Sequence, residues 1–292
     1  MPRDMRQLTM ADYDEVKALS STIWEGNDYV PSMFPKWVES PQVSVIGIFE
    51  GEELAALCAL EIVAGTRIGW IEGLRVKENH RNKGLATALV ERVIDEAWAR
   101  DVGVLRYATG SRNVPSQRVA EKVGFRLTTR VGYLRIESPF PAHPLPSPSV
   151  VPLKVSPERL HGLIQQFPAL IDVERIPFAW GFDDKDLEAL RRLGQRTEFN
   201  VIMGNDGSPL ALYFHRVVNQ GETQRAAYSL FAQDRTMFVD AMSRVIDDAA
   251  SSGIERVAVF LGLREKEWSK RLGYVSSEFD DRYFLLYELS RP

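Results

Sequence analysis

The sequence predicts an α+β (α/β) protein with two related halves, each a mixed, mostly antiparallel sheet flanked by helices. Three observations support this fold class. Strand-like apolar patterns fill residues 43–76, and a helix–strand–helix–strand order follows over residues 85–137. A proline-rich stretch divides the chain near its middle. Part of the first half also recurs in the second half, at an offset of about 150 residues.

The elements of the first half are predicted from their periodicity and their turn residues. Gly51 and Gly65 mark the turns between neighbouring strand patterns, and Gly124 marks a helix end. The elements expected, in order, are a strand at 6–8, a helix from Ala11, a short helix around 34–38, strands at 43–49, 54–63 and 67–76, a helix at 85–100, a strand at 104–109, a helix at 113–123 and a strand at 125–137.

Six prolines lie in the polar stretch Ser138–Pro152. Proline fixes φ and has no backbone donor, so repeated proline predicts an extended linker of limited flexibility. We therefore expect one domain over residues 1–137, a linker over 138–152, and a second domain over 153–292.

Composition limits the classes of function. With 292 residues and 45% hydrophobic content, the chain can bury two medium-sized cores. A net charge of -4 without a long basic stretch argues against nucleic-acid binding. The absence of a secretory core and of a membrane-length apolar run predicts no membrane partner and a cytoplasmic location. Cys58 is the single cysteine and is expected to be buried, and the scattered histidines predict no metal site.

The segment Arg81–Ala86 follows a strand pattern and opens a helix. A loop at a helix N-terminus points backbone N–H groups at one spot, where the helix dipole favours negative charge. Gly84 permits close approach to a phosphate, and Arg81 and Lys83 add positive charge. We predict a diphosphate site here. The alternative is a charged turn before an ordinary amphipathic helix.

Two spaced motifs resemble those of the GNAT superfamily of N-acetyltransferases. The pattern Arg81-x-x-Gly84-x-Ala86 is similar to its acetyl-CoA loop. Asn113-x-x-Ser116, followed by residues 121–125, is similar to its Asn-x-x-Ala/Ser and Tyr-Glu-Lys-x-Gly-Phe segment. The resemblance covers residues 1–137 and implies tandem GNAT folds with acetyl-CoA as co-substrate. The coenzyme-binding residues that it implies are Leu74, Val76, Arg81, Asn82, Lys83, Gly84, Leu85, Ala86, Thr87, Asn113 and Ser116.

In that family the strand before the loop separates from its neighbour at a bulge, and the pantetheine arm inserts there. Gly73 suits such a bulge, and the backbone of Leu74 and Val76 would pair with the arm. An N–H near Leu74 would then stabilise the oxyanion formed on the thioester carbonyl. The alternative role for Leu74 and Val76 is core packing alone.

Acetyl transfer requires a neutral amine, so a base is needed. Glu72 borders the expected acetyl-binding gap and is the candidate, although an ordinary exposed strand glutamate would look the same. The tyrosine that protonates the leaving thiolate in the family is replaced by Ala120. The substitutes considered are Ser116, Tyr107, Tyr133 and water.

The segment 24–37 lies where GNAT proteins place their acceptor-site helices. Its aromatic and acidic residues suit a small cationic amine, and Glu25, Asp28 and Tyr29 are the candidate substrate contacts. Residues 28–32 also resemble the two-domain histidine N-acetyltransferase group. Core packing is an equally good account of Trp24 and Trp37.

The second half is predicted to be a degenerate copy. Residues 101–108 correspond to 251–258, which places Phe231–Thr236 opposite Arg81–Ala86. This second segment has no glycine, and Asp234 would repel a diphosphate.

The sequence therefore predicts an acetyl-CoA-dependent N-acetyltransferase that acts on the amine of a small molecule, such as a free amino acid, with histidine as an example. The competing prediction is a non-catalytic acyl-CoA-binding or regulatory module. The missing tyrosine at Ala120 favours the module, and the loop and Glu72 favour the enzyme.

Overall fold

A computed structural model describes residues 4–26, 28–220, 223–274 and 277–292 of the chain. Contacts within the chain define two compact units. Unit 1 comprises Met1–Thr109, Asn113–Leu127 and Leu286–Pro292, and unit 2 comprises Gly110–Arg112 and Thr128–Leu285. These units are defined by contacts within the chain, whereas the predicted division at residues 137 and 153 rests on the proline-rich stretch between them and stays a prediction.

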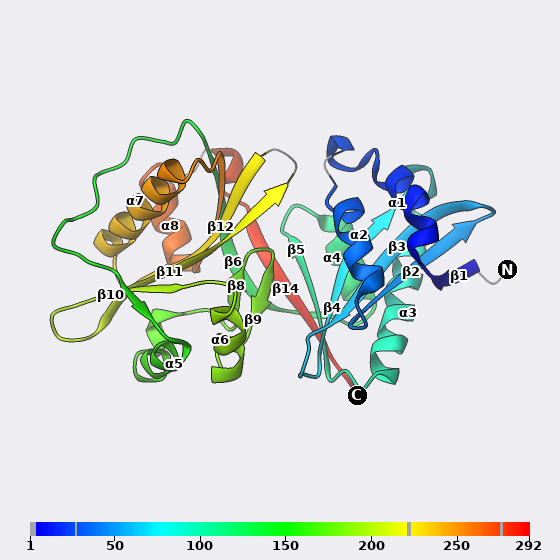
Figure 1. Cartoon of the computed structure of the whole chain (residues 1–292), viewed down its shortest axis with the longest axis horizontal. Helices are drawn as coiled ribbons and strands as arrows, with labels where there is room; N and C mark the ends of the chain where they lie inside the picture. The colour runs from blue at the N-terminus through cyan, green and yellow to red at the C-terminus, as the bar shows by residue number, and fades with distance from the viewer. Residues whose placement is uncertain (1–3, 27, 221–222, 275–276) are drawn as a thin grey trace. The chain divides into compact units, whose positions relative to one another are not determined.

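Unit 1 is a twisted sheet with helices on both faces (Figure 1). Its strands follow the spatial order β1-β2-β3-β4-β5, and each neighbouring pair is antiparallel except β4 and β5, which are parallel. The strands are β1 (Asp4–Gln7), β2 (Val43–Glu50), β3 (Glu53–Ile62), β4 (Ile68–Val76) and β5 (Val104–Gly110). The helices are η1 (Met10–Asp12), α1 (Tyr13–Ser20), η2 (Ile23–Gly26), α2 (Val30–Glu39), η3 (Glu78–His80), α3 (Leu85–Ala99) and α4 (Val114–Lys122).

Side chains along each strand of unit 1 point alternately to the two faces of the sheet, and each face packs against helices. Leu57 and Ala59 of β3 pack with α1 and α2, in a cluster that includes Phe34 and Trp37. The α3 helix places its buried stripe, which includes Leu89 and Val93, against the sheet, and it contacts α4. The predicted elements of the first half are confirmed, with small shifts at their ends.

The last strand, β14 (Tyr283–Ser290), contributes its final residues to unit 1. Glu288 accepts a hydrogen bond from Arg106 at 2.9 Å, and both side chains are largely buried. The Tyr287 hydroxyl donates to Glu121 of α4 at 3.3 Å. Unit 1 is therefore completed by residues that lie far along the chain.

In unit 2 the strands follow the order β6-β13-β12-β11-β10-β7, and each neighbouring pair is antiparallel except β12 and β13, which are parallel. Its strands are β6 (Arg126–Glu137, in unit 2 from Thr128), β7 (Leu153–Val155), β10 (Phe199–Met203), β11 (Pro209–Gln220), β12 (Thr223–Ala232) and β13 (Arg256–Leu261), with a separate hairpin of β8 (Ile176–Phe178) and β9 (Gly181–Asp183). Its helices are α5 (Pro157–Gln166), η4 (Pro168–Leu170), α6 (Leu187–Gly194), α7 (Arg235–Ser251), α8 (Leu263–Arg271) and η5 (Ser277–Phe279).

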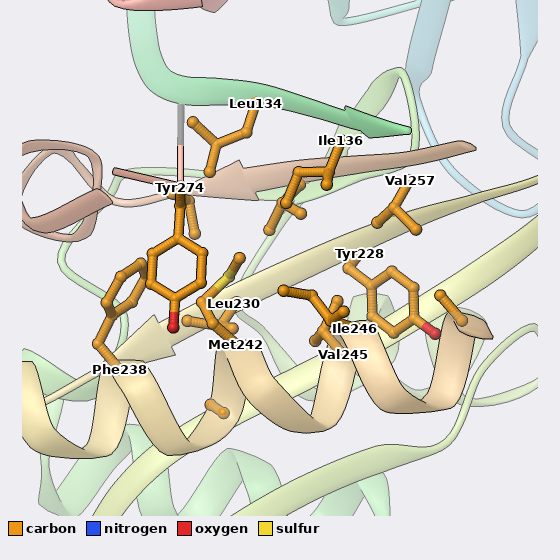
Figure 2. Packing of buried hydrophobic residues seen from close by; sticks show 14 of the residues in the cluster. Leu134, Ile136, Tyr228, Leu230, Phe238, Met242, Val245, Ile246, Val257 and Tyr274 are labelled. Carbon is orange, nitrogen blue, oxygen red and sulfur yellow. The ribbon is translucent and has the colours of Figure 1, made fainter. Parts of the chain in front are cut away.

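Helix α7 supplies much of the unit 2 core. Figure 2 shows Phe238, Met242 and Val245 on the face of this helix that packs in the same core cluster as the sheet residues Tyr228 and Leu230. Each of these five side chains is fully buried. A helix, strand, helix, strand order over α7, β13, α8 and β14 repeats the order seen from α3 to β6. The mixed α+β class predicted from the sequence is confirmed.

The predicted linker, residues 138–152, contains no helix or strand. It is held on α7 by polar contacts: the Ser147 N–H donates to Asp240 at 2.7 Å, and Arg244 donates to the Val150 carbonyl at 2.6 Å. His143 lies 2.9 Å from Asp247 of the same helix. Among the helices of the described residues, none has the length and apolar character needed to cross a bilayer.

Candidate functional site

A β-bulge interrupts β4 at the predicted position. Two residues of β4, Gly73 and Leu74, face the single residue Cys58 of β3, where the register of the pair shifts. Gly73 has a φ of 61°, and a Cβ there would lie 2.7 Å from the Trp37 ring. The bulge therefore requires glycine both for backbone conformation and for space. Cys58 is fully buried, as expected.

Strands β4 and β5 separate beside this bulge. Their parallel ladder starts at Ile68 and ends at Ile71, opposite Tyr107. Beyond this point β4 continues to Val76 and β5 to Gly110 without pairing to each other in the described structure. Leu74 and Val76 lie in the separated part of β4. This geometry suits an extended ligand arm that takes the place of a strand.

The turn before α3 is built to receive an anion. Gly84 is the N-cap of α3 with a φ of 75°, and Asn82 also has a positive φ. Residues 81–84 are exposed, whereas Leu85 is buried and Ala86 and Thr87 are partly buried. The first turn contains no acidic residue, and no side chain caps it. The first N–H groups of a helix have no intrahelical partner, so their dipoles face this exposed turn.

A polar network that the sequence did not reveal anchors this turn to β3. Glu53 pairs with Lys77 through one carboxylate oxygen, and its other oxygen lies 2.7 Å from Nε2 of His80. His80 Nδ1 lies 3.2 Å from the Lys83 ammonium. These hydrogen bonds, from Lys77 first and then His80, lower the pKa of Glu53 to about 2. The network fixes the position of Lys83 in the predicted diphosphate site.

The start of α4 and the end of the β4–β5 ladder are joined by a hydrogen bond between the hydroxyl groups of Tyr107 and Ser116. Asn113 caps α4 by accepting from the Ser116 N–H at 3.4 Å. Burial raises the pKa of Tyr107 to about 12. Ala120, at the position where the family resemblance implies a tyrosine, is buried. The pair of Tyr107 and Ser116 therefore places two hydroxyl groups at the point where β4 and β5 separate.

The acceptor segment is connected to the bulged strand by an ion pair. Arg75 donates to both carboxylate oxygens of Asp28, at 2.7 and 2.9 Å, and the Asp28 side chain is only 1% exposed. The sequence suggested that Asp28 holds a cationic acceptor, but the structure already provides this carboxylate with a guanidinium partner. Nothing at the sequence level pointed to Arg75.

Tyr29 lies against Trp37 with its ring edge-on, at a centroid distance of 6.2 Å. Burial raises the pKa of Tyr29 to about 12, and the nearby charge of Glu72 acts in the same direction. Glu72 of β4 therefore lies near Tyr29, the residue that precedes α2. The Glu25 side chain lies outside the part of the chain that the structure describes. The described residues contain no group of three or more His, Cys, Asp or Glu that could hold a metal ion.

Residues 4–125 match the model of the acetyltransferase (GNAT) family. This segment is a GNAT acetyltransferase domain. It contains the bulge, the separated strands and the turn before α3.

Curated relatives match less than half of the chain. A probable N-acetyltransferase 16 from Homo sapiens is 28% identical over 46% of this chain and 36% of its own length. A histidine N-acetyltransferase from Oreochromis niloticus is 28% identical over 41% of this chain and 37% of its own length. The chain therefore aligns with little more than a third of each of these relatives.

Solved structures also match the chain over both units. A tandem GNAT protein from the clavulanic acid biosynthesis pathway has a TM-score of 0.62 with this chain, at 8% identity. The alignment covers 100% of this chain and 99% of that protein. At this level of identity the likeness shows the fold, and the fold of the whole chain is the tandem GNAT fold.

Proposed function

We propose that the chain transfers an acetyl group from acetyl-CoA to the amine of a small molecule. The observation that carries the proposal is the separation of β4 and β5 next to an uncapped helix N-terminus, within a GNAT domain. An extended arm with a diphosphate at one end matches this arrangement. The reducing cytoplasm, where we expect the protein to act, suits a chain whose single thiol is buried.

The residues implied by the resemblance fit the coenzyme in two groups. The turn Arg81–Gly84 and the first N–H groups of α3, from Leu85 to Thr87, would bind the diphosphate. The backbone of Leu74 and Val76 would pair with the pantetheine arm, and Asn113 and Ser116 at the start of α4 would contact its far side. Each group consists of exposed or partly exposed positions, apart from the buried Leu85 side chain.

The proposed chemistry needs a base, an oxyanion donor and support for the leaving thiolate. Glu72 accepts the proton of the acceptor amine, directly or through water, and the Leu74 N–H stabilises the oxyanion. A thiol with a pKa of about 8.5 is a stronger acid than Tyr107, whose pKa is about 12. Tyr107 would therefore donate a hydrogen bond to the thiolate through its own hydroxyl or that of Ser116, and a full proton transfer is not needed.

The proposed acceptor is a free amino acid, and histidine is the first to test because a relative carries that name. Tyr29 and Glu72 would line the acceptor side, together with Glu25. We assign Asp28 a supporting role in the same site, because its ion pair with Arg75 fixes the acceptor segment against β4.

Coenzyme A release from acetyl-CoA, measured with a panel of amino acids, polyamines and aminoglycosides, tests this proposal. Turnover with a free amino acid supports it. Tight acetyl-CoA binding without turnover on any amine would instead favour the non-catalytic acyl-CoA-binding module, for which the alanine at position 120 is the structural argument.

A further inference from the structure

Three arginines lie side by side on one face of the unit 2 sheet. Strands β6, β13 and β12 are neighbours, and Glu137, Arg256 and Arg225 are partners in their register. Register partners point to the same face of a sheet, as do residues two apart on one strand, so Arg135 shares this face. The side chains agree with this placement, because the Nε atoms of Arg135 and Arg256 lie 3.0 and 2.6 Å from the same oxygen, Oε1 of Glu137.

A fourth arginine joins this group near Tyr133, which precedes Arg135 by two residues on the same strand. The positive charges of Arg135, Arg282, Arg256 and Arg225 all act on the Tyr133 hydroxyl and oppose the rise that burial causes in its pKa. These four residues are named the arginine cluster. All of them belong to unit 2.

An aromatic ring supports two guanidinium groups of the arginine cluster. The guanidiniums of Arg135 and Arg282 lie over the Phe279 ring, 5.5 and 4.0 Å from its centroid. Arg282 also pairs with Glu278. A guanidinium that is already held by a ring and by a carboxylate loses little further freedom when it binds a ligand. The cluster is therefore partly ordered before any ligand arrives.

The arginine cluster concentrates positive charge on a chain whose net charge is -4. Glu137 is the carboxylate that Arg135 and Arg256 share. With Arg225 these side chains bring together three positive charges and one negative charge. Burial, followed by the positive charges of Arg256 and Arg135, lowers the pKa of the Arg225 guanidinium, so the repulsion within the group is felt there. An anion with two charges would balance the excess.

We propose that the arginine cluster binds the phosphate group of a small molecule. A phosphate monoester carries about 1.5 to 2 negative charges at neutral pH and three strong acceptor oxygens, which matches the charge excess and a set of side chains that only donate. Planar guanidiniums bind phosphate oxygens in a bidentate manner. A ligand can reach them, since the side chains of Arg135, Arg256 and Arg282 are 37%, 33% and 26% exposed. A single carboxylate matches less well, because it would leave part of the positive charge unbalanced. The proposal does not depend on the acetyltransferase activity.

Calorimetric titration of the whole chain with phenyl phosphate and with inorganic phosphate, at constant ionic strength, tests the site. We expect both to bind the cluster at one equivalent, and acetate to bind far more weakly. No binding of either phosphate at millimolar concentration would overturn the proposal, as would equally tight binding of acetate. Binding of inorganic phosphate alone would overturn the assignment to a phosphorylated molecule.

The turn before α3 is a second place where phosphate can bind, so the titration is repeated with Gly84→Asp, which puts a negative charge at that turn. The equivalent bound at the arginine cluster should remain in this variant. Its disappearance would show that the phosphate was bound in unit 1, and would refute the proposal while leaving the coenzyme site intact as an explanation.

Two variants of the arginine cluster predict changes of opposite sign. Arg225→Gln removes one guanidinium and keeps both contacts of Glu137, so phenyl phosphate affinity should fall about ten- to hundredfold. Glu137→Gln removes the carboxylate that competes with the ligand for Arg135 and Arg256, so affinity should rise about tenfold. A cluster with a purely structural role predicts no gain.

Arg191→Gln is the matched control for Arg225→Gln. It removes the same charge from an arginine on α6 that is 47% exposed and pairs with Glu158 and Glu188, so phosphate affinity should not change. If Arg225→Gln does not fold, the gain in Glu137→Gln still tests the site. Unchanged affinity in Glu137→Gln and in a folded Arg225→Gln would refute the assignment, as would an equal loss in the control.

Discussion

The two units start an equivalent helix in opposite ways. At α3 the N-cap is Gly84, which has no side chain, whereas at α7 the N-cap is Asp234, whose carboxylate accepts from the Met237 N–H at 2.9 Å. In unit 2 the positive end of the helix is thus occupied by an anion of the chain itself. In unit 1 the same place is exposed and flanked by Arg81 and Lys83.

The parallel strand pairs of the two units also differ: β4 and β5 separate in unit 1, whereas β12 and β13 stay paired in unit 2. Arg106 of β5 and Arg256 of β13 are equivalent in the sequence repeat. The β4–β5 ladder extends one residue beyond Arg106, to Tyr107, whereas the β12–β13 ladder continues to Leu261 at the end of β13. In unit 2 the Asp234 cap therefore occupies the helix N-terminus, and the strand pairing leaves no gap between β12 and β13. The corresponding places in unit 1, at α3 and between β4 and β5, are open. The comparison teaches that a helix cap and a few added sheet hydrogen bonds are enough to close, within one fold, the gap that unit 1 leaves between its strands.

The largest loss of turnover is predicted for a change at Glu72. The equivalent position in unit 2 is Ala227 of β12, which has no carboxylate that could act as a base. Glu72→Gln keeps the shape of the side chain but removes the base, and should lower turnover by roughly 10²–10⁴ with coenzyme affinity nearly unchanged. Higher pH should restore part of the rate by supplying neutral amine. Steady-state kinetics over pH measure this. Joint loss of turnover and affinity without pH rescue would mean that Glu72 only orients the strand.

Introducing the unit 2 cap into unit 1 should weaken coenzyme binding. Gly84→Asp puts a carboxylate at the N-terminus of α3, and we expect acetyl-CoA affinity to fall about a hundredfold. Gly84→Asn is the matched control, since asparagine tolerates the positive φ equally well but carries no charge. Calorimetry on the folded variants distinguishes the two. Equal affinities for the two variants would show that charge at the cap is not the cause.

Removing the bulge glycine should damage both stability and binding. Gly73→Ala places a Cβ 2.7 Å from the Trp37 ring and strains a φ of 61°, so we expect about 1–3 kcal/mol of destabilisation and weaker acetyl-CoA binding. Gly65→Ala is the control, because its φ is also positive, at 72°, but nothing lies near the added Cβ. The melting temperatures of the two variants are compared: Gly65→Ala reports the backbone strain alone, and any further loss in Gly73→Ala reports the contact with Trp37. A Gly73→Ala melting temperature equal to that of the control would contradict the crowding argument.

The smallest expected effect concerns the number of bound coenzymes. Asp234→Gly removes the cap of α7, yet the closed β12–β13 ladder should still exclude the pantetheine arm. We expect one equivalent of acetyl-CoA per chain for both wild type and variant in a calorimetric titration. A second equivalent in the variant would show that the cap alone closes unit 2, and a second equivalent in the wild type would refute its degeneracy.

Sequence reasoning worked where a local pattern determines a local structure. The periodicity of residues 43–76 predicted strands, and the loop before α3 predicted a helix start; the structure confirms both. Residue types and spacing were sufficient for these features because each depends on a few neighbours in the chain. The bulge at Gly73, which the structure also confirms, was implied by the family resemblance.

The unpredicted features all join residues distant in sequence. The pair of Arg75 with Asp28 links positions 47 apart, and the contact between His80 and Glu53 links positions 27 apart. Alternation shows which side of a strand a residue occupies, but it does not show which loop packs there. For this reason Asp28 looked like a ligand for a cationic substrate, when its charge is already balanced within the protein.

The division of β14 between the units also affects how the chain is made. Unit 1 includes Leu286–Pro292, so its packing, including the burial of Arg106 by Glu288, waits for residues that the ribosome adds at the far end of the described chain. Domains usually fold as units, with the N-terminal one first during synthesis. Here the first unit of the described chain to emerge is completed by residues that follow unit 2, so unit 1 finishes packing only after unit 2 has been translated.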